Sequence, residues 1–238
     1  MLVIVAAAYA LVRVIGVGRL AEQDAEGIGA LLQIIGTLYS VLYAFATYVI
    51  WGQFSAVESE ILKEAGALKS LLRFSQRLNN ESREPIVRAV KTYVRGVVET
   101  EWPALSNRED TANTDKLFSE VVSSVTAVKP TSESERLIYD QLLEIINQAS
   151  AHRDERIAVS LTRIPKTLLT LVTLTAFTIL LLVLVYPFRN LPLGLASMLV
   201  TTTLVYLAHF VLTDLDNPFE GTWNVTPDRF GVLINRFE

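Results

Sequence analysis

The chain has 238 residues, of which 51% are hydrophobic and 19% are charged, and its formal net charge at pH 7 is -4. Soluble domains carry about 25% charged residues, and here the apolar residues form continuous blocks near both ends, which indicates a membrane protein. The lack of cysteine excludes disulfides and thiolate chemistry, and the acidic balance leaves no basic surface for nucleic acid.

Four apolar blocks qualify as membrane-spanning helices. They cover residues 1–18, 28–51, 167–186 and 192–213. A spanning helix needs roughly 20 residues, so the last three blocks are long enough and the first is marginal. The alternative for the first block is a cleaved signal peptide. We predict a retained helix instead, because no Lys or Arg precedes its apolar run, as one normally does in a secretory signal.

Four spans place both termini and the long segment between the second and third blocks on one side of the membrane. Basic residues flank that segment where it meets the membrane, namely Lys63, Lys69, Arg73, Arg153, Arg156, Arg163 and Lys166. The positive-inside rule therefore predicts that this segment and both termini are cytoplasmic. The expected organisation is all-α, with two spans in 1–51, a cytoplasmic helical domain in 52–166, two spans in 167–213 and a cytoplasmic tail in 214–238.

Apolar residues recur at helical spacing throughout the cytoplasmic segment. The pattern predicts helices over 55–78, 82–101 and 114–128 and a fourth that starts after Ser132. Pro103 follows Trp102, so we expect the second helix to stop there and residues 103–114 to form a loop.

Catalytic constellations are missing from the sequence. With no cysteine and only two histidines, His152 and His209, we predict no enzyme, no metal site and no cofactor. Two polar residues inside the apolar blocks are candidates for a role in the membrane. Arg13 is expected to reach the outer headgroups, and His209 either forms a hydrogen bond between helices or titrates beside a conduction path.

The second block has small or polar residues on one side and the aromatic residues Tyr39, Tyr43, Phe45, Tyr48 and Trp51. One interpretation is a tightly packed central helix, since small residues let helices approach closely. The other is a helix that lines a symmetry axis. Thr37, Val41 and Phe45 recur at steps of four and would then form apolar rings able to gate by dewetting.

Several motifs resemble the bestrophin pattern, in which an apolar neck helix is paired with an Asn-Pro-Phe-Gly-type turn after the last span. They are GTLYSVLYAFATYVIWGQF (residues 36–54), VESEILKEAGAL (57–68), the Glu101-Trp102 pair and LDNPFEG (215–221). The chain is most similar to the bacterial bestrophin-like family of unknown function. The resemblance implies a pentameric channel in the bacterial inner membrane, with the second span lining the pore and the middle helices around a vestibule.

Carried over by position, the resemblance assigns Val41 and Phe45 to the neck and Thr37 one turn outward, or Ala44 to the neck if the register slips by one. Calcium-activated members have an aspartate run after the turn. Here Gly221 is followed by Thr-Trp-Asn, so we predict no calcium gating.

The stretch DLDNPFEG follows the last apolar block and admits three interpretations: a structural turn, a regulatory ion site or a subunit contact. We favour the turn. Asp214 or Asp216 can accept backbone hydrogen bonds, and Pro218 fixes the bend. Asn217, Phe219 and Gly221 complete this motif.

The sequence thus predicts a homo-oligomeric channel for small ions, whose partners are the bilayer and copies of itself. Chloride follows from the resemblance only. Acidic residues favour cations, because rings of acids concentrate them. These are Glu22, Asp24 and Glu26 in the outer loop and Glu58, Glu60 and Glu64 after the second block. The alternative is a non-conducting scaffold or sensor, which dimers packed through Gly29 and Gly36 would favour. A secondary transporter fits less well, since no broken-helix pair is evident.

Overall fold

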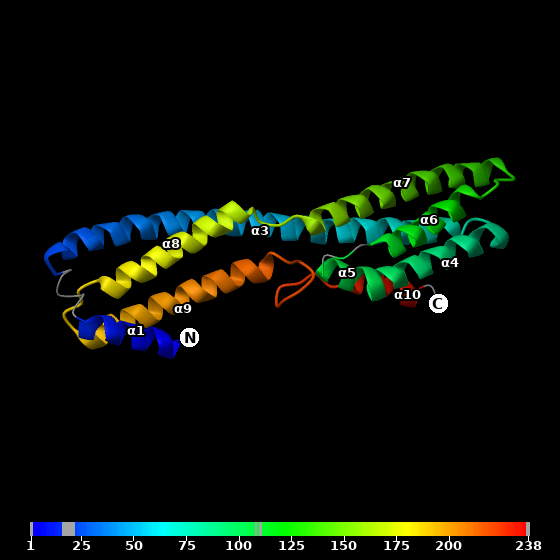
Figure 1. Cartoon of the computed structure of the whole chain (residues 1–238). Helices are drawn as coiled ribbons and strands as arrows, with labels where there is room; N and C mark the ends of the chain where they lie inside the picture. Colours follow the sequence, from blue (N-terminus) through cyan, green and yellow to red (C-terminus); the bar gives the residue numbers. More distant parts are fainter. Residues whose placement is uncertain (1, 16–21, 108, 110, 237–238) are drawn as a thin grey trace. The chain divides into compact units, whose positions relative to one another are not determined.

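The computed structural model describes residues 2–15, 22–107, 109 and 111–236, and these form helices joined by turns, with no strand among them (Figure 1). The chain divides into two compact units. Unit 1 comprises Met1–Trp51 and Ile164–Asp216, and unit 2 comprises Gly52–Arg163 and Asn217–Glu238. Helix α3 (Ala25–Ser75) contributes residues to both.

Unit 1 contains α1 (Leu2–Ile15), the first part of α3 after a short 3-10 turn at Glu22–Asp24, α8 (Lys166–Val185) and α9 (Leu191–Leu215). Helices α1, α8 and α9 contact one another in pairs. Their core is built from Tyr9, Ile179, Val183 and Met198, against which Leu32, Ile35 and Tyr39 of α3 pack.

Three helical segments of the described residues are long and apolar enough to cross a bilayer: Ala25–Ser75, Glu133–Val185 and Leu191–Leu215. The first predicted span corresponds to a shorter apolar helix, Val3–Ile15, and its expected end at residue 18 lies outside the described residues. Helix α3 has 51 residues, roughly two and a half times the ~20 that a span requires.

Among its described residues, unit 2 contains the second part of α3 and six further helices. They are α4 (Asn80–Gly96), the π-helix η2 (Val97–Glu101), α5 (Trp102–Asn107), α6 (Ala112–Thr126), α7 (Glu133–Leu161) and α10 (Asp228–Arg236). Apolar side chains from each of these elements meet in one core. Leu68, Val90, Leu105, Val121 and Leu142 are fully buried in it, and so is Phe230 from the C-terminal helix.

The loop expected over 103–114 is wrong at both ends, because α6 begins at Ala112 and, at the start, the chain continues as α5 through Asn107. The reason is the place of Pro103 in the first turn of α5, where a helix makes no use of the missing N–H. Proline therefore marks the start of a new helix here.

Gly194 of α9 lies directly against Tyr9 of α1. The side chain of Tyr9, which is fully buried, lies so close that a Cβ at position 194 would overlap its hydroxyl and ring. The same Cβ would meet Cβ of Phe188 at 3.0 Å. Only glycine fits between these side chains.

We expect Gly194→Ala to destabilise the protein by about 1–3 kcal/mol, since an added methyl in a packed core forces its neighbours to move. Gly27→Ala is the matched control, because no heavy atom lies within 4 Å of a Cβ at that position. The melting temperature of the purified protein in detergent checks both. Equal melting of the two variants would contradict this packing.

Candidate functional site

In unit 1, helix α3 packs with one face and leaves the other exposed. Ala46 and Ile50 are buried, whereas Val41, Phe45 and Tyr48 are 62%, 55% and 77% exposed. Contiguous apolar surface of this kind is uncommon on soluble monomers and marks contact with lipid or with another protein surface. The exposed face of α3 is therefore a candidate site of unit 1, although α8 and α9 also expose large apolar side chains such as Phe177 and Leu204.

The four residues singled out from the sequence, Thr37, Val41, Ala44 and Phe45, are all exposed on α3. Because Ala44 and Phe45 are both exposed, the structure is compatible with either register of the neck. Tyr48, one of the aromatic residues of this block, is exposed as well. It lies one turn beyond Ala44 on the exposed face, and its spacing of seven from Val41 is the signal that identifies it.

Three hydroxyls on this part of α3 are bonded within the helix. The hydroxyls of Thr37, Ser40 and Thr47 each donate to the carbonyl oxygen four residues earlier, and each donor–acceptor distance is 2.9 Å. A hydroxyl bonded in this way needs no other partner. The face therefore presents mainly methyl groups and rings to its surroundings.

Arg13 has partners inside unit 1. Its Nη2 donates to the hydroxyl of Tyr9 at 2.9 Å and to the carbonyl oxygen of Tyr186 at 2.8 Å. Tyr186 is the C-cap residue of α8. Carbonyls at a helix C-terminus carry partial negative charge, so Arg13 caps α8 and ties α1 to it.

His209 joins α9 to α8. Its Nε2 lies 3.3 Å from Oγ1 of Thr173, whose hydroxyl also lies 2.7 Å from the carbonyl oxygen of Leu169 and donates to it. The geometry is that of a hydrogen bond between helices, the simpler of the two roles considered for this residue.

A fully buried ion network lies in unit 2 around Arg156 of α7. Its Nε donates to Oε2 of Glu64 on α3 and its Nη2 donates to Oε1 of Glu101 in η2, both at 2.6 Å. None of the three side chains has measurable exposure. Three elements far apart in sequence are thus joined by two charge-assisted hydrogen bonds.

Further polar groups surround this centre. Nη2 of Arg153 donates to Glu101 at 3.1 Å and to Asp115 at 2.5 Å, and the Thr114 hydroxyl also donates to Glu101. The hydroxyl of Tyr93 donates to Oε1 of Glu64 at 2.5 Å. Helices α4 and α6 are in this way connected to the same carboxylates.

Burial and pairing shift the acid–base behaviour of the network. Burial raises the pKa of Tyr93 well above its usual value, and the nearby negative charge of Glu64 raises it further, so the phenol stays a donor. Burial lowers the pKa of Arg156, but the attraction of Glu64 and then of Glu101 outweighs it and the net shift is upward. The ion pairs therefore favour the charged form of the guanidinium.

The π-helix η2 positions the Glu101-Trp102 pair. Glu101 enters the ion network, while the next residue, Trp102, enters the apolar core, where its ring packs against Phe219 and Phe230. Short π-helical turns recur where a fold needs side chains in unusual positions. The sequence identified this pair as a motif without indicating the partners of either residue.

The network changes two expectations drawn from charge alone. Arg153 and Arg156, counted as basic residues flanking the membrane, are buried in ion pairs and present no charge to a lipid surface. Glu64 is buried against Arg156, and Glu60 is buried and paired with Lys63 and His152. Of the three acids expected along the vestibule, only Glu58 is exposed.

Glu60 and its partners form a second, smaller link between α3 and α7. Its carboxylate lies 2.6 Å from Nζ of Lys63 and 2.8 Å from Nδ1 of His152. Burial raises the pKa of Glu60, but the hydrogen bonds from Lys63 and His152 and their charges outweigh it, so the net shift is downward.

The stretch from Asp214 to Gly221 forms a turn. Oδ1 of Asp216 accepts from the backbone N–H of Ile164 at 2.8 Å, and Oδ1 of Asn217 accepts from Arg163 at 3.3 Å. The amide of Asn217 also donates to the carbonyl oxygen of Ser106 at 3.1 Å. The carboxylate and amide groups of this motif thus bind the chain itself.

The second half of the turn is held by Pro218, Phe219 and Gly221. The Pro218 carbonyl accepts from the N–H of Val225 at 2.8 Å, and the Phe219 ring lies 5.1 Å from that of Trp102. Gly221 has a φ of 93°, a conformation that only glycine adopts without strain. These contacts hold the second half of the turn against unit 2 residues.

Comparison with known proteins decides the family. The sequence model of the Bestrophin-like domain matches residues 1–230. The chain belongs to the bestrophin-like family. No curated protein sequence shows significant similarity to it.

Solved structures of bacterial bestrophins share the fold of this bestrophin-like chain. A point mutant of a bestrophin homologue from Klebsiella pneumoniae aligns with a TM-score of 0.77 at 11% identity, covering 98% of each chain. Another structure of a Klebsiella pneumoniae bestrophin homologue gives a TM-score of 0.73 at 12% identity, with 98% of this chain and 94% of that chain covered. Together with its apolar helices, the family indicates that the bestrophin-like chain is a membrane protein.

We expect Arg156→Met to destabilise this bestrophin-like protein by about 3–5 kcal/mol, because the change leaves two buried carboxylates without their shared cation. Arg88→Met is the matched control, since Arg88 is exposed on α4. Thermal unfolding followed by tryptophan fluorescence measures both, with Trp102 reporting on the core of unit 2. Wild-type melting of Arg156→Met would show that the network is dispensable for stability.

Proposed function

We propose that the protein is an oligomeric ion channel whose pore is lined by the first part of α3. The observation that carries the proposal is the exposed apolar face of α3, on which Val41, Phe45 and Tyr48 have no covering partner among the described residues. Several copies of such a face arranged around an axis would enclose an apolar constriction. A constriction of this kind gates by dewetting and still conducts when it widens.

The bestrophin-like family and the fold support ion conduction as the class of function. The four-span topology, a cytoplasmic unit 2, a location in the bacterial inner membrane and a pentamer belong to the same proposal. Arg153 and Arg156 are buried in ion pairs and no longer support the positive-inside argument. Lys69, Arg73 and Lys166 are exposed and still support it.

The proposal also concerns the charge of the permeant ion. Chloride follows from the resemblance to bestrophins, whereas the exposed carboxylate of Glu58 favours cations. Since the acids of the second part of α3 reduce to this one exposed residue, the preference for cations is weaker than the sequence suggested. We therefore propose an anion pathway, with cation flux as the competing outcome.

Ion flux from the purified protein in liposomes tests the proposal, with chloride and potassium gradients imposed in turn. The Val41→Ala/Phe45→Ala double variant should raise the flux at least several-fold, because smaller side chains widen an apolar constriction and ease its wetting. The protein should remain assembled, since both side chains are exposed and their loss opens no core cavity.

Leu204→Ala serves as the control, because Leu204 is also exposed but lies on α9, outside the proposed ring. Unchanged flux in the double variant, with the oligomer intact, would refute the proposed ring. Absence of flux from intact wild-type oligomers would instead favour the scaffold. Of the two glycines in that alternative, a Cβ added at Gly29 would lie 3.9 Å from the ring of Tyr186 within unit 1, whereas no heavy atom lies within 4 Å of a Cβ at Gly36.

A further inference from the structure

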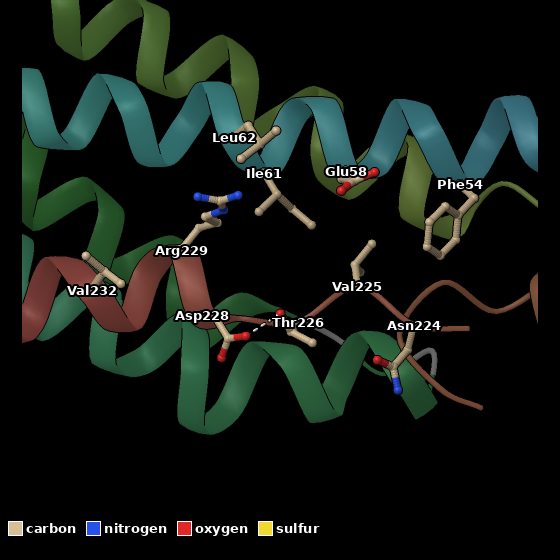
Figure 2. Close-up of a pocket in the computed structure, with 10 residues that line it drawn as sticks. All are labelled: Phe54, Glu58, Ile61, Leu62, Asn224, Val225, Thr226, Asp228, Arg229 and Val232. Carbon is tan, nitrogen blue, oxygen red and sulfur yellow. Dashed lines mark hydrogen bonds between the residues drawn. The ribbon is translucent and has the colours of Figure 1, made fainter. Parts of the chain in front are cut away.

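A cavity of about 340 Å³ lies within unit 2 between α3 and the C-terminal segment. One wall is formed by Phe54, Glu58, Ile61 and Leu62 of α3, and the other by residues 224–226 and by α10 (Figure 2). Pockets that hold small ligands begin at about 300 Å³ and combine apolar walls with a few polar groups. Its volume and its mixed lining therefore suit a small ligand.

The apolar part of the cavity comes from both walls. Phe54 and Ile61 project from α3, and Val225 projects toward them from the opposite wall (Figure 2). Val225 is buried and fixed by two hydrogen bonds: its N–H donates to Pro218 and its carbonyl accepts from Trp102 at 3.2 Å. The position of Val225 in the cavity wall is therefore fixed by the turn at Pro218 and by Trp102 of the core.

Two opposite charges line the cavity without meeting. Glu58 lies on the α3 wall, while the guanidinium of Arg229 is directed from α10 toward α3 (Figure 2). No ion pair or hydrogen bond joins either side chain to any described residue. Asp228, the third charged group of the lining, is already bonded by the Thr226 hydroxyl at 2.8 Å. Glu58 and Arg229 thus offer a hydrogen-bond acceptor and a hydrogen-bond donor on opposite walls of the cavity, and neither is bonded to a described residue.

We propose that this cavity binds a zwitterion in which a primary ammonium and a phosphate are separated by a few atoms. The ammonium pairs with the carboxylate of Glu58 on the α3 wall. The phosphate pairs with Arg229, because the planar fork of a guanidinium matches two phosphate oxygens. The carbon chain between the two groups lies on Ile61 and Val225.

A lipid headgroup and a free metabolite share this chemistry. Phe54 follows Trp51, the end of the apolar block, by only three residues, which makes an ammonium–phosphate lipid headgroup the nearest supply. Free phosphoethanolamine offers the same two charges without a membrane. The site requires both charges, whichever source supplies them.

Isothermal titration of the full-length protein in phosphate-free detergent tests the charges separately, with phosphoethanolamine, ethanolamine and inorganic phosphate as ligands. Phosphoethanolamine should bind at least about tenfold more tightly than either half, since each hydrogen-bonded charge contributes that much. Glu58→Gln and Arg229→Gln should each weaken its binding by about tenfold or more. Glu84→Gln and Arg88→Gln, exposed on α4 and outside the cavity, should leave binding unchanged.

Native mass spectrometry distinguishes the two sources. Protein from bilayers that contain phosphatidylethanolamine and phosphatidylglycerol should retain the former, and the Glu58→Gln/Arg229→Gln double variant should lose it. Retention of the lipid identifies a headgroup site, whereas titration by phosphoethanolamine without retained lipid identifies a free ligand.

Three results would overturn the proposal. Binding of ethanolamine or phosphate alone as tight as that of phosphoethanolamine would show a site for a single charge. Indifference of binding to both cavity variants would place the ligand elsewhere. Failure of both ligand sources to bind the wild-type protein would leave a cavity filled only by solvent. Because every readout is binding, these outcomes do not depend on whether the chain conducts ions.

Discussion

Helix α3 supplies one packed face to each of the two units, and the remaining structure is arranged around this constraint. In unit 1 the packed face closes the core formed by Tyr9, Ile179, Val183 and Met198. In unit 2 the packed face carries apolar residues such as Leu68 and also the carboxylate of Glu64. A helix that is committed on one side in this way leaves its other side for lipid, for copies of the chain or for a permeation path.

The buried charges of unit 2 solve a specific physical problem. An isolated carboxylate in a protein interior costs several kcal/mol, so Glu64 and Glu101 need the guanidinium of Arg156, which bonds both, and Glu101 also pairs with Arg153. The arrangement fixes α3, η2 and α7 at defined positions along their lengths, which apolar contacts alone do not specify. Arg153, Tyr93 and Thr114 satisfy the other oxygens of the same carboxylates and extend this constraint to α4 and α6.

Hydropathy and helical periodicity were sufficient to predict an all-helical chain and most of its helices, because both depend on local sequence. The resemblance drawn from short motifs correctly gave the bestrophin-like family. Pairing between distant residues was not predictable. Arg156 looks like any basic residue near an apolar block, and nothing local indicates that Glu64, 92 residues away, takes its charge. The helix that begins at Trp102 was not predicted, because a proline such as Pro103 is found both just after the end of a helix and in the first turn of one.

The chain crosses between the units at Trp51–Gly52, Arg163–Ile164 and Asp216–Asn217, so each unit is assembled from separated parts of the sequence. The core of unit 2 includes Phe219, Val225, Phe230 and Leu233, all of which follow the last apolar helix. During synthesis, α4, α6 and α7 emerge from the ribosome long before these residues do. The core of unit 2 therefore stays incomplete until α8 and α9 have been synthesised. A chain truncated after α9 lacks the side chains that complete this core.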